Sequence, residues 1–131
     1  MTGEAGPKEI RVMHVEDHPD FRDLMQVLLN SQSDIELVAQ ASSLVEARAQ
    51  AEKFEFDVAV LDLGLPDGNG MDLIADLRRI NPDVGVLILS ANLDPAGSER
   101  AADTSADEIM DKLAPLDDVL GTVRRLGKCD L

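Results

Sequence analysis

Apolar residues along the chain fall into runs of strand length that are separated by segments with helical spacing. Four runs cover residues 10–15, 35–41, 58–61 and 84–89, and a fifth, weaker run surrounds Ile109 and Met110. Short apolar runs that alternate with amphipathic helices are typical of a parallel sheet covered by helices on both faces. The pattern therefore predicts a doubly wound α/β fold with a five-stranded parallel sheet.

The intervening segments predict the helices. A stripe from Phe21 to Leu29, with Asp20 in the first turn, predicts the first helix. Ser43 can cap a second helix, Asn81 and Pro82 end a third, and Pro115 suits the start of the last. The expected inward faces of these three are Leu44, Ala47, Ala51 and Phe54; Leu73, Ile74, Leu77 and Ile80; and Leu116, Val119, Leu120, Val123 and Leu126.

Residues 93–105 differ from these helices because they offer mainly alanines for burial and contain a glycine. They predict a short, weakly anchored fourth helix, which we expect to move most easily. At 131 residues the chain fits one domain, expected over 10–127 between a leader at 1–9 and a tail at 128–131.

Composition narrows the partners and the compartment. The formal charge of −14 and an aromatic content of 2% disfavour direct nucleic-acid binding, which needs basic residues and stacking rings. No apolar stretch has the length of a signal peptide or a membrane span. The single cysteine, Cys129, excludes an internal disulfide and indicates a reducing compartment, so we expect a cytoplasmic protein.

Five polar residues stand where the expected strands end. Glu16 and Asp17 follow the first strand, Asp62 the third, Ser90 the fourth and Lys112 the fifth. Each alone is explained as a helix cap or a solvated side chain. Ligands of a doubly wound sheet bind beyond the carboxyl ends of its strands, where these residues would meet.

Three carboxylates about 5 Å apart would repel one another by roughly 3 kcal/mol per pair, so they call for a cation. An all-oxygen site suits Mg²⁺, and a carboxylate-bound Mg²⁺ is typical of phosphoryl transfer. A nearby lysine and hydroxyl could hold the remaining phosphoryl oxygens.

Four segments carry a family resemblance: VMHVEDHPD at 12–20, VAVLDLGLPDGNG at 58–70, VLILSA at 86–91 and DKLAPL at 111–116. In order and spacing they resemble two-component receiver domains of the CheY-like fold over essentially the whole chain. VEDHP and the Lys-x-x-Pro after the fifth strand resemble most the NarL/LuxR-type subfamily, whose members carry a helix-turn-helix domain.

The resemblance implies a role for each site residue. Asp62 would be the phosphoacceptor, Asp17 a direct Mg²⁺ ligand, Glu16 a ligand directly or through a water, and the backbone carbonyl of Gly64 the remaining protein ligand. Ser90 matches the switch hydroxyl and Lys112 the lysine that pairs with the phosphoryl group. Ala91 would keep the approach to Asp62 open. Pro66 and Gly70 match the turn into the third helix, where a glycine can take backbone angles that other residues avoid.

Two features depart from the family pattern. Ile109 stands where most receivers have a tyrosine or phenylalanine that turns inward, and Thr104 to Asp107 replace an Ala-Gly-Ala run. The phosphorylation chemistry should survive these changes, whereas the route from phosphate to partner would differ. His14 is expected to be packed inside the first strand and His18 to face solvent, so neither suggests a phosphohistidine relay.

The resemblance implies a signalling domain that catalyses only its own phosphorylation and slow dephosphorylation. Its partners would be a sensor histidine kinase or phosphotransfer protein and an output protein or domain. No membrane contact is expected, and a homodimer is possible.

A flavodoxin-like carrier is disfavoured because the sequence Glu-Asp-His-Pro-Asp after the first strand would repel a phosphate. A phosphatase of the haloacid dehalogenase type is also disfavoured, because it needs a second aspartate two residues after the first, and that position is Gly64. Two alternatives remain: the regulatory part of a helix-turn-helix transcription factor, and a phosphorylation-independent interaction domain.

Overall fold

A sheet of five parallel strands forms the centre of the molecule in the computed structural model, which describes residues 10–91 and 106–127. The strands are β1 (Ile10–Val15), β2 (Ile35–Ala41), β3 (Val58–Leu61), β6 (Gly85–Ser90) and β7 (Glu108–Asp111). Their order is β2-β1-β3-β6-β7, and each neighbouring pair is parallel. The predicted doubly wound sheet is therefore confirmed.

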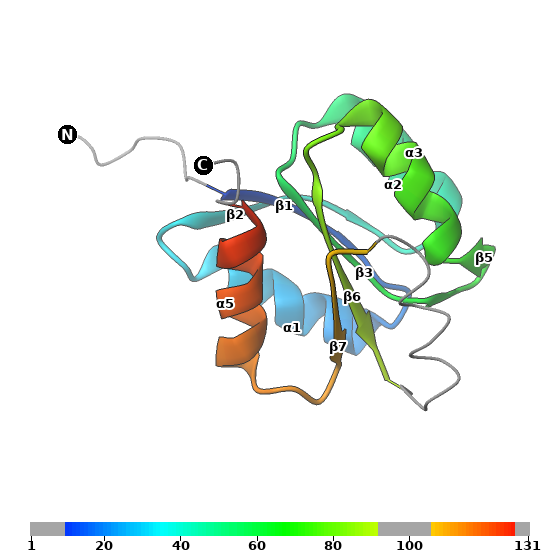
Figure 1. Ribbon diagram of the computed structural model, residues 1–131. Helices are drawn as coiled ribbons and strands as arrows, with labels where there is room; N and C mark the ends of the chain where they lie inside the picture. Colours follow the sequence, from blue (N-terminus) through cyan, green and yellow to red (C-terminus); the bar gives the residue numbers. More distant parts are fainter. Residues whose placement is uncertain (1–9, 92–105, 128–131) are drawn as a thin grey trace.

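Helices cover both faces of this sheet (Figure 1). Helices α1 (Pro19–Asn30) and α5 (Leu116–Gly127) lie on one side, and α2 (Leu44–Lys53) and α3 (Met71–Ile80) lie on the other. Each side has its own buried apolar cluster, with Met25, Leu29 and Val123 in one and Ala47, Leu73 and Leu77 in the other. The strands are thus buried on both faces, which is why they appear as continuous apolar runs.

Helix ends follow the expected chemistry. The hydroxyl oxygen of Ser43 accepts a hydrogen bond from the backbone N–H of Glu46 at 3.1 Å, which caps α2. Asn81 is the C-cap of α3. Arg124, in the last turn of α5, pairs with Asp34 at 2.8 Å and so ties this helix to the segment before β2.

Three residues expected on inward helix faces are exposed instead. Leu24, part of the stripe predicted for the first helix, is 44% exposed. Phe54 is 43% exposed because it follows the last residue of α2 in an extended conformation. Ile80, 39% exposed, is the last residue of α3.

The predicted leader at 1–9, the fourth helix at 93–105 and the tail with Cys129 lie outside the described residues. None of the helices in the described part of the chain has the length and hydrophobicity of a membrane span.

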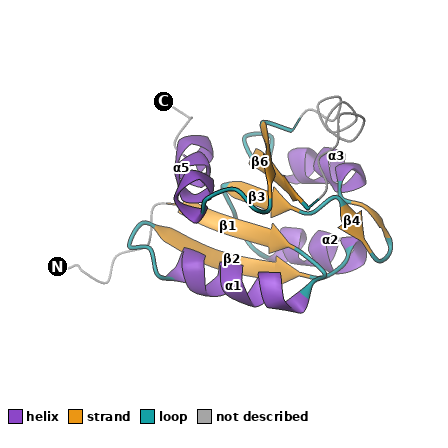
Figure 2. Ribbon diagram, turned by 90° about the horizontal axis from the view of Figure 1, so that it is seen from below, coloured by secondary structure: helices purple, strands orange, loops and turns teal. Residues whose placement is uncertain are grey.

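A small antiparallel hairpin, which the apolar pattern does not predict, follows β3. Its strands are β4 (Gly64–Leu65) and β5 (Gly68–Asn69), and it lies at the end of the sheet to which the β1 arrow points in Figure 2. Gly68 takes a φ of 153°, which favours glycine. The expectation that Gly70 needs unusual backbone angles is wrong, since its φ is −56°. Glycine is required there because a Cβ would collide with the carbonyl oxygen of Asp62.

Candidate functional site

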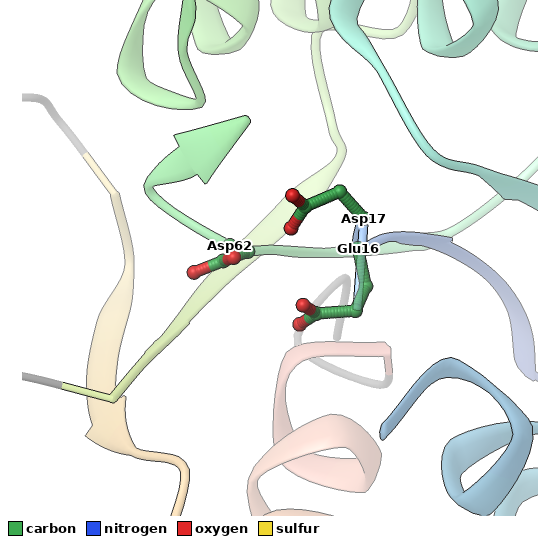
Figure 3. A group of neighbouring side chains, drawn as sticks. All are labelled: Glu16, Asp17 and Asp62. Atoms are coloured by element: carbon green, nitrogen blue, oxygen red, sulfur yellow. The ribbon is translucent and has the colours of Figure 1, made fainter. Parts of the chain in front are cut away.

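Three carboxylates meet at the carboxyl ends of β1 and β3. Val15 and Leu61 are partners in the parallel ladder, so Glu16, Asp17 and Asp62 leave adjacent strands side by side. One carboxylate oxygen from each residue lies within 4.8 Å of the others, and all three groups point into the same space (Figure 3). The structure thus brings together the acidic residues that the sequence places after these strands.

Glu16 is the buried member of this acidic cluster, with an exposed fraction of 1%. Its carboxylate accepts a hydrogen bond from the backbone N–H of His18 at 3.1 Å and lies 2.8 Å from Nζ of Lys112. Burial raises the pKa of Glu16, and the hydrogen bond from Lys112 opposes this effect without cancelling it. A further cation close to Glu16 would therefore stabilise the charged form of this buried carboxylate.

Lys112, which follows β7, places a positive charge beside two of the three acids. Besides Glu16, its Nζ approaches Oδ2 of Asp62 at 3.4 Å. The same ammonium lies 5.0 Å from the ring centroid of Phe21 on α1, a cation–π contact. Lys112 is therefore held between the acidic cluster and an aromatic face, and its side chain is only 15% exposed.

The remaining predicted site residues occupy the same edge of the sheet. Ser90 is the last residue of β6 and is buried, and its carbonyl oxygen accepts the backbone N–H of Lys112 at 3.0 Å. Ala91 follows it and is exposed. Gly64, the first residue of β4, is also exposed and lies two residues beyond Asp62.

Both histidines are placed as expected. His14 is buried in β1, and burial lowers its pKa to about 3, so the ring is neutral near neutral pH. Its Nδ1 lies 3.3 Å from the side-chain amide nitrogen of Gln40, which also donates to the carbonyl oxygen of Arg22 on α1. His18 is exposed. His14 is therefore a packed residue that, through Gln40, links β1 to β2 and α1.

Sequence reasoning missed two contacts near the site. Phe21 was expected only as part of the buried stripe of α1, whereas its ring faces Lys112. Asp67 was not singled out, yet its carboxylate accepts the backbone N–H groups of Leu44 at 2.7 Å and Val45 at 3.0 Å. No local sequence signal identifies either contact, because each joins segments that are far apart in the chain.

The chain is similar to known proteins over most of its length. A sequence model of the response regulator receiver domain matches residues 12–124. The response regulator protein VraR of Staphylococcus aureus (strain Mu3 / ATCC 700698) is 29% identical over 119 residues, which are 91% of this chain and 57% of that protein. The chain therefore spans little more than half the length of such relatives.

Solved structures share the fold. The signal receiver domain of the response regulator NarL from Mycobacterium tuberculosis superposes with a TM-score of 0.84 at 26% identity, covering 93% of this chain and 98% of that one. A DNA-binding response regulator of the LuxR family from Staphylococcus aureus gives a TM-score of 0.82 at 21% identity, covering 91% and 99%.

Proposed function

Because the chain belongs to the response regulator receiver domain family, we propose that Asp62 accepts a phosphoryl group in a magnesium-dependent reaction that switches the partners of the domain. The observation that carries this proposal is the convergence of Glu16, Asp17 and Asp62, with oxygens within 4.8 Å of one another, beside the ammonium of Lys112. Ionisable side chains that converge at the carboxyl ends of the strands of a doubly wound sheet, with one carboxylate buried, are typical of a functional site.

The residues of the acidic cluster fit Mg²⁺. All three offer carboxylate oxygens, the ligands that Mg²⁺ prefers, and no histidine or thiol belongs to the group among the described residues. Glu16, Asp17 and Asp62 would hold the ion, with the backbone carbonyl of Gly64 as the remaining protein ligand. When bound, Mg²⁺ neutralises the charge that gathers on the phosphoryl oxygens.

The side chains of this domain supply the rest of the reaction. A carboxylate oxygen of Asp62 attacks the phosphorus of a phosphohistidine, an acyl phosphate forms, and the P–N bond breaks as the imidazole leaves and takes up a proton. Lys112, already 3.4 Å from Asp62, and the hydroxyl of Ser90 then donate to the phosphoryl oxygens. Water later hydrolyses the acyl phosphate and restores the carboxylate. The domain thus acts only on itself.

The partners follow from this chemistry. A sensor histidine kinase or phosphotransfer protein would supply the phosphoryl group, and an output domain or protein would respond to it. Relatives are described as DNA-binding response regulators, but with a charge of −14 we assign DNA contact to an output domain and not to this one. A homodimer is a compatible form, and a single cysteine suits the cytoplasm.

Intact-protein mass spectrometry after incubation with acetyl phosphate and MgCl₂ tests the proposal. Wild type should gain one phosphoryl group, Asp62→Asn none, and a chelator should prevent the gain. Asp83→Asn is the matched control, because Asp83 is an exposed aspartate before β6, at the opposite end of the sheet. Equal labelling of Asp62→Asn would place the acceptor elsewhere. No labelling of wild type would favour a phosphorylation-independent interaction domain.

A further inference from the structure

The β4–β5 hairpin, which begins two residues after Asp62, is fixed at its base. The backbone N–H of Gly70 donates to the carbonyl oxygen of Leu63 at 2.8 Å. Gly70 also packs so closely on the carbonyl of Asp62 that no side chain would fit there. The backbone of Asp62 is therefore part of the closed end of the hairpin, and movement of the hairpin would move Asp62.

The tip of the hairpin is fixed by a second set of contacts, to α2. Oδ1 of Asp67 accepts the N–H of Leu44 at 2.7 Å, and Oδ2 accepts the N–H of Val45 at 3.0 Å. These are the first two residues of α2, whose N–H groups have no partner within the helix. Gly68 packs on the Leu44 side chain, since a Cβ on it would lie 2.6 Å from Cδ1.

Helix α2 is itself firmly placed, so it can serve as an anchor. Its inward residues Leu44, Ala47 and Ala51 are buried against the sheet. Arg48 pairs with Asp76 of α3 at 2.7 Å, which joins the two helices on this face. A hairpin attached to α2 is consequently attached to the body of the domain.

We propose that Asp67 is a positioning residue for the acidic cluster: by bonding the first turn of α2, it holds the hairpin and with it Asp62 in the geometry that binds Mg²⁺. The inference rests on the proposed function, because it assigns Asp67 a role toward that metal. Groups behind metal ligands reduce the freedom of the ligands, and their loss lowers metal affinity. Without Asp67 the hairpin keeps its base contacts but loses both hydrogen bonds at its tip.

Three variants of the full chain separate this role from its alternatives. Asp67→Ala removes both hydrogen bonds. Asp67→Asn removes the charge and keeps one acceptor oxygen, so its side chain can accept only one of the two N–H groups. Ser43→Ala removes the other cap of α2, the bond to Glu46, and leaves the hairpin contacts in place. Each is titrated with MgCl₂ by isothermal calorimetry, and amide hydrogen exchange is measured on the metal-free proteins.

We expect Asp67→Ala to bind Mg²⁺ about tenfold more weakly than wild type, the lower end of the range for groups behind metal ligands. Asp67→Asn should recover part of the loss, and Ser43→Ala should match wild type. In the metal-free proteins, Asp67→Ala should speed exchange at the N–H groups of Leu44, Val45 and Gly70. Ser43→Ala should not speed exchange at Gly70.

Three results would overturn the inference while leaving the proposed function intact. Wild-type affinity in Asp67→Ala would show that the hairpin needs no anchor. A loss of Mg²⁺ affinity in Asp67→Ala without faster exchange at Leu44, Val45 and Gly70 would assign the effect to charge, and equal losses of affinity in Ser43→Ala and Asp67→Ala would assign it to α2. A wild type that binds no Mg²⁺ would instead overturn the metal site and the proposed function with it.

Discussion

Replacing Lys112 by methionine should destabilise the metal-free domain, because Glu16 would keep its buried negative charge without the cation that balances it. Glu16 is 1% exposed and lies 2.8 Å from the lysine, whose side chain is 15% exposed. Removing one member of a buried ion pair costs about 3–5 kcal/mol. Glu16 can avoid part of this cost by taking up a proton, so we expect a loss of about 3 kcal/mol at pH 7.

The pH dependence identifies the cause. The pKa of Glu16 is already raised, chiefly by burial, and loss of the Lys112 hydrogen bond raises it further. A carboxyl group with a raised pKa in the folded state binds protons more tightly when folded. Its protonation therefore contributes stability that is fully present below about pH 4.5 and is lost as the pH rises through the folded pKa. The deficit of Lys112→Met should accordingly shrink between pH 7 and pH 5.

Urea unfolding followed by circular dichroism at both pH values measures these changes. Lys53→Met is the matched control, because Lys53 is an exposed lysine at the end of α2 and its loss changes the net charge equally. We expect the control to lose less than about 1 kcal/mol, the usual contribution of a cation at a helix C-terminus. MgCl₂ should restore stability to Lys112→Met. Equal losses in both variants, or a deficit that does not change with pH, would refute this view of the acidic cluster.

Two further predictions concern the residues behind the site. The pKa of His14 is lowered to about 3 in the folded domain, so below about pH 6.5 the histidine binds a proton in the unfolded chain but not in the folded one. The free energy of unfolding should therefore fall by up to about 1.4 kcal/mol per pH unit as the pH is lowered below 6.5. His14→Gln should flatten this slope in urea unfolding, and equal slopes in wild type and His14→Gln would contradict the assignment. Phe21→Leu keeps apolar bulk but removes the ring beside Lys112, and a double-mutant cycle with Lys112→Met should give a coupling of about 0.5–2 kcal/mol. A coupling of zero would show that the contact contributes nothing.

The parallel sheet and its ends could be predicted from the sequence because both have local signals. Strands buried on two faces are continuous apolar runs. The bounds predicted for β1, β2 and β3 therefore agree with the structure, and both predicted bounds of β6 lie one residue too early. Parallel strands end at one edge of a sheet, which is sufficient to bring Glu16, Asp17, Asp62 and Lys112 together. The roles of these residues in phosphorylation remain predictions.

Contacts between distant segments could not be predicted. Asp67 caps a helix that begins more than twenty residues earlier, and Phe21 contacts Lys112 across the edge of the sheet. Phe54 and Ile80 match the helical spacing but lie where their helices end, and periodicity locates helix ends poorly. At Gly70 the glycine was anticipated for its backbone angles, whereas the close carbonyl of Asp62 is the real constraint.

Borohydride reduction of the domain after treatment with acetyl phosphate and MgCl₂ tests the central claim most directly. Borohydride reduces an aspartyl phosphate to homoserine and leaves ordinary carboxylates unchanged, so peptide mass spectrometry then locates the acceptor at a single residue. We predict homoserine at position 62 and at none of the other acidic positions, with no conversion when Mg²⁺ is chelated. Homoserine at another aspartate, or none at all in wild type, would contradict the assignment of Asp62 as the phosphoacceptor.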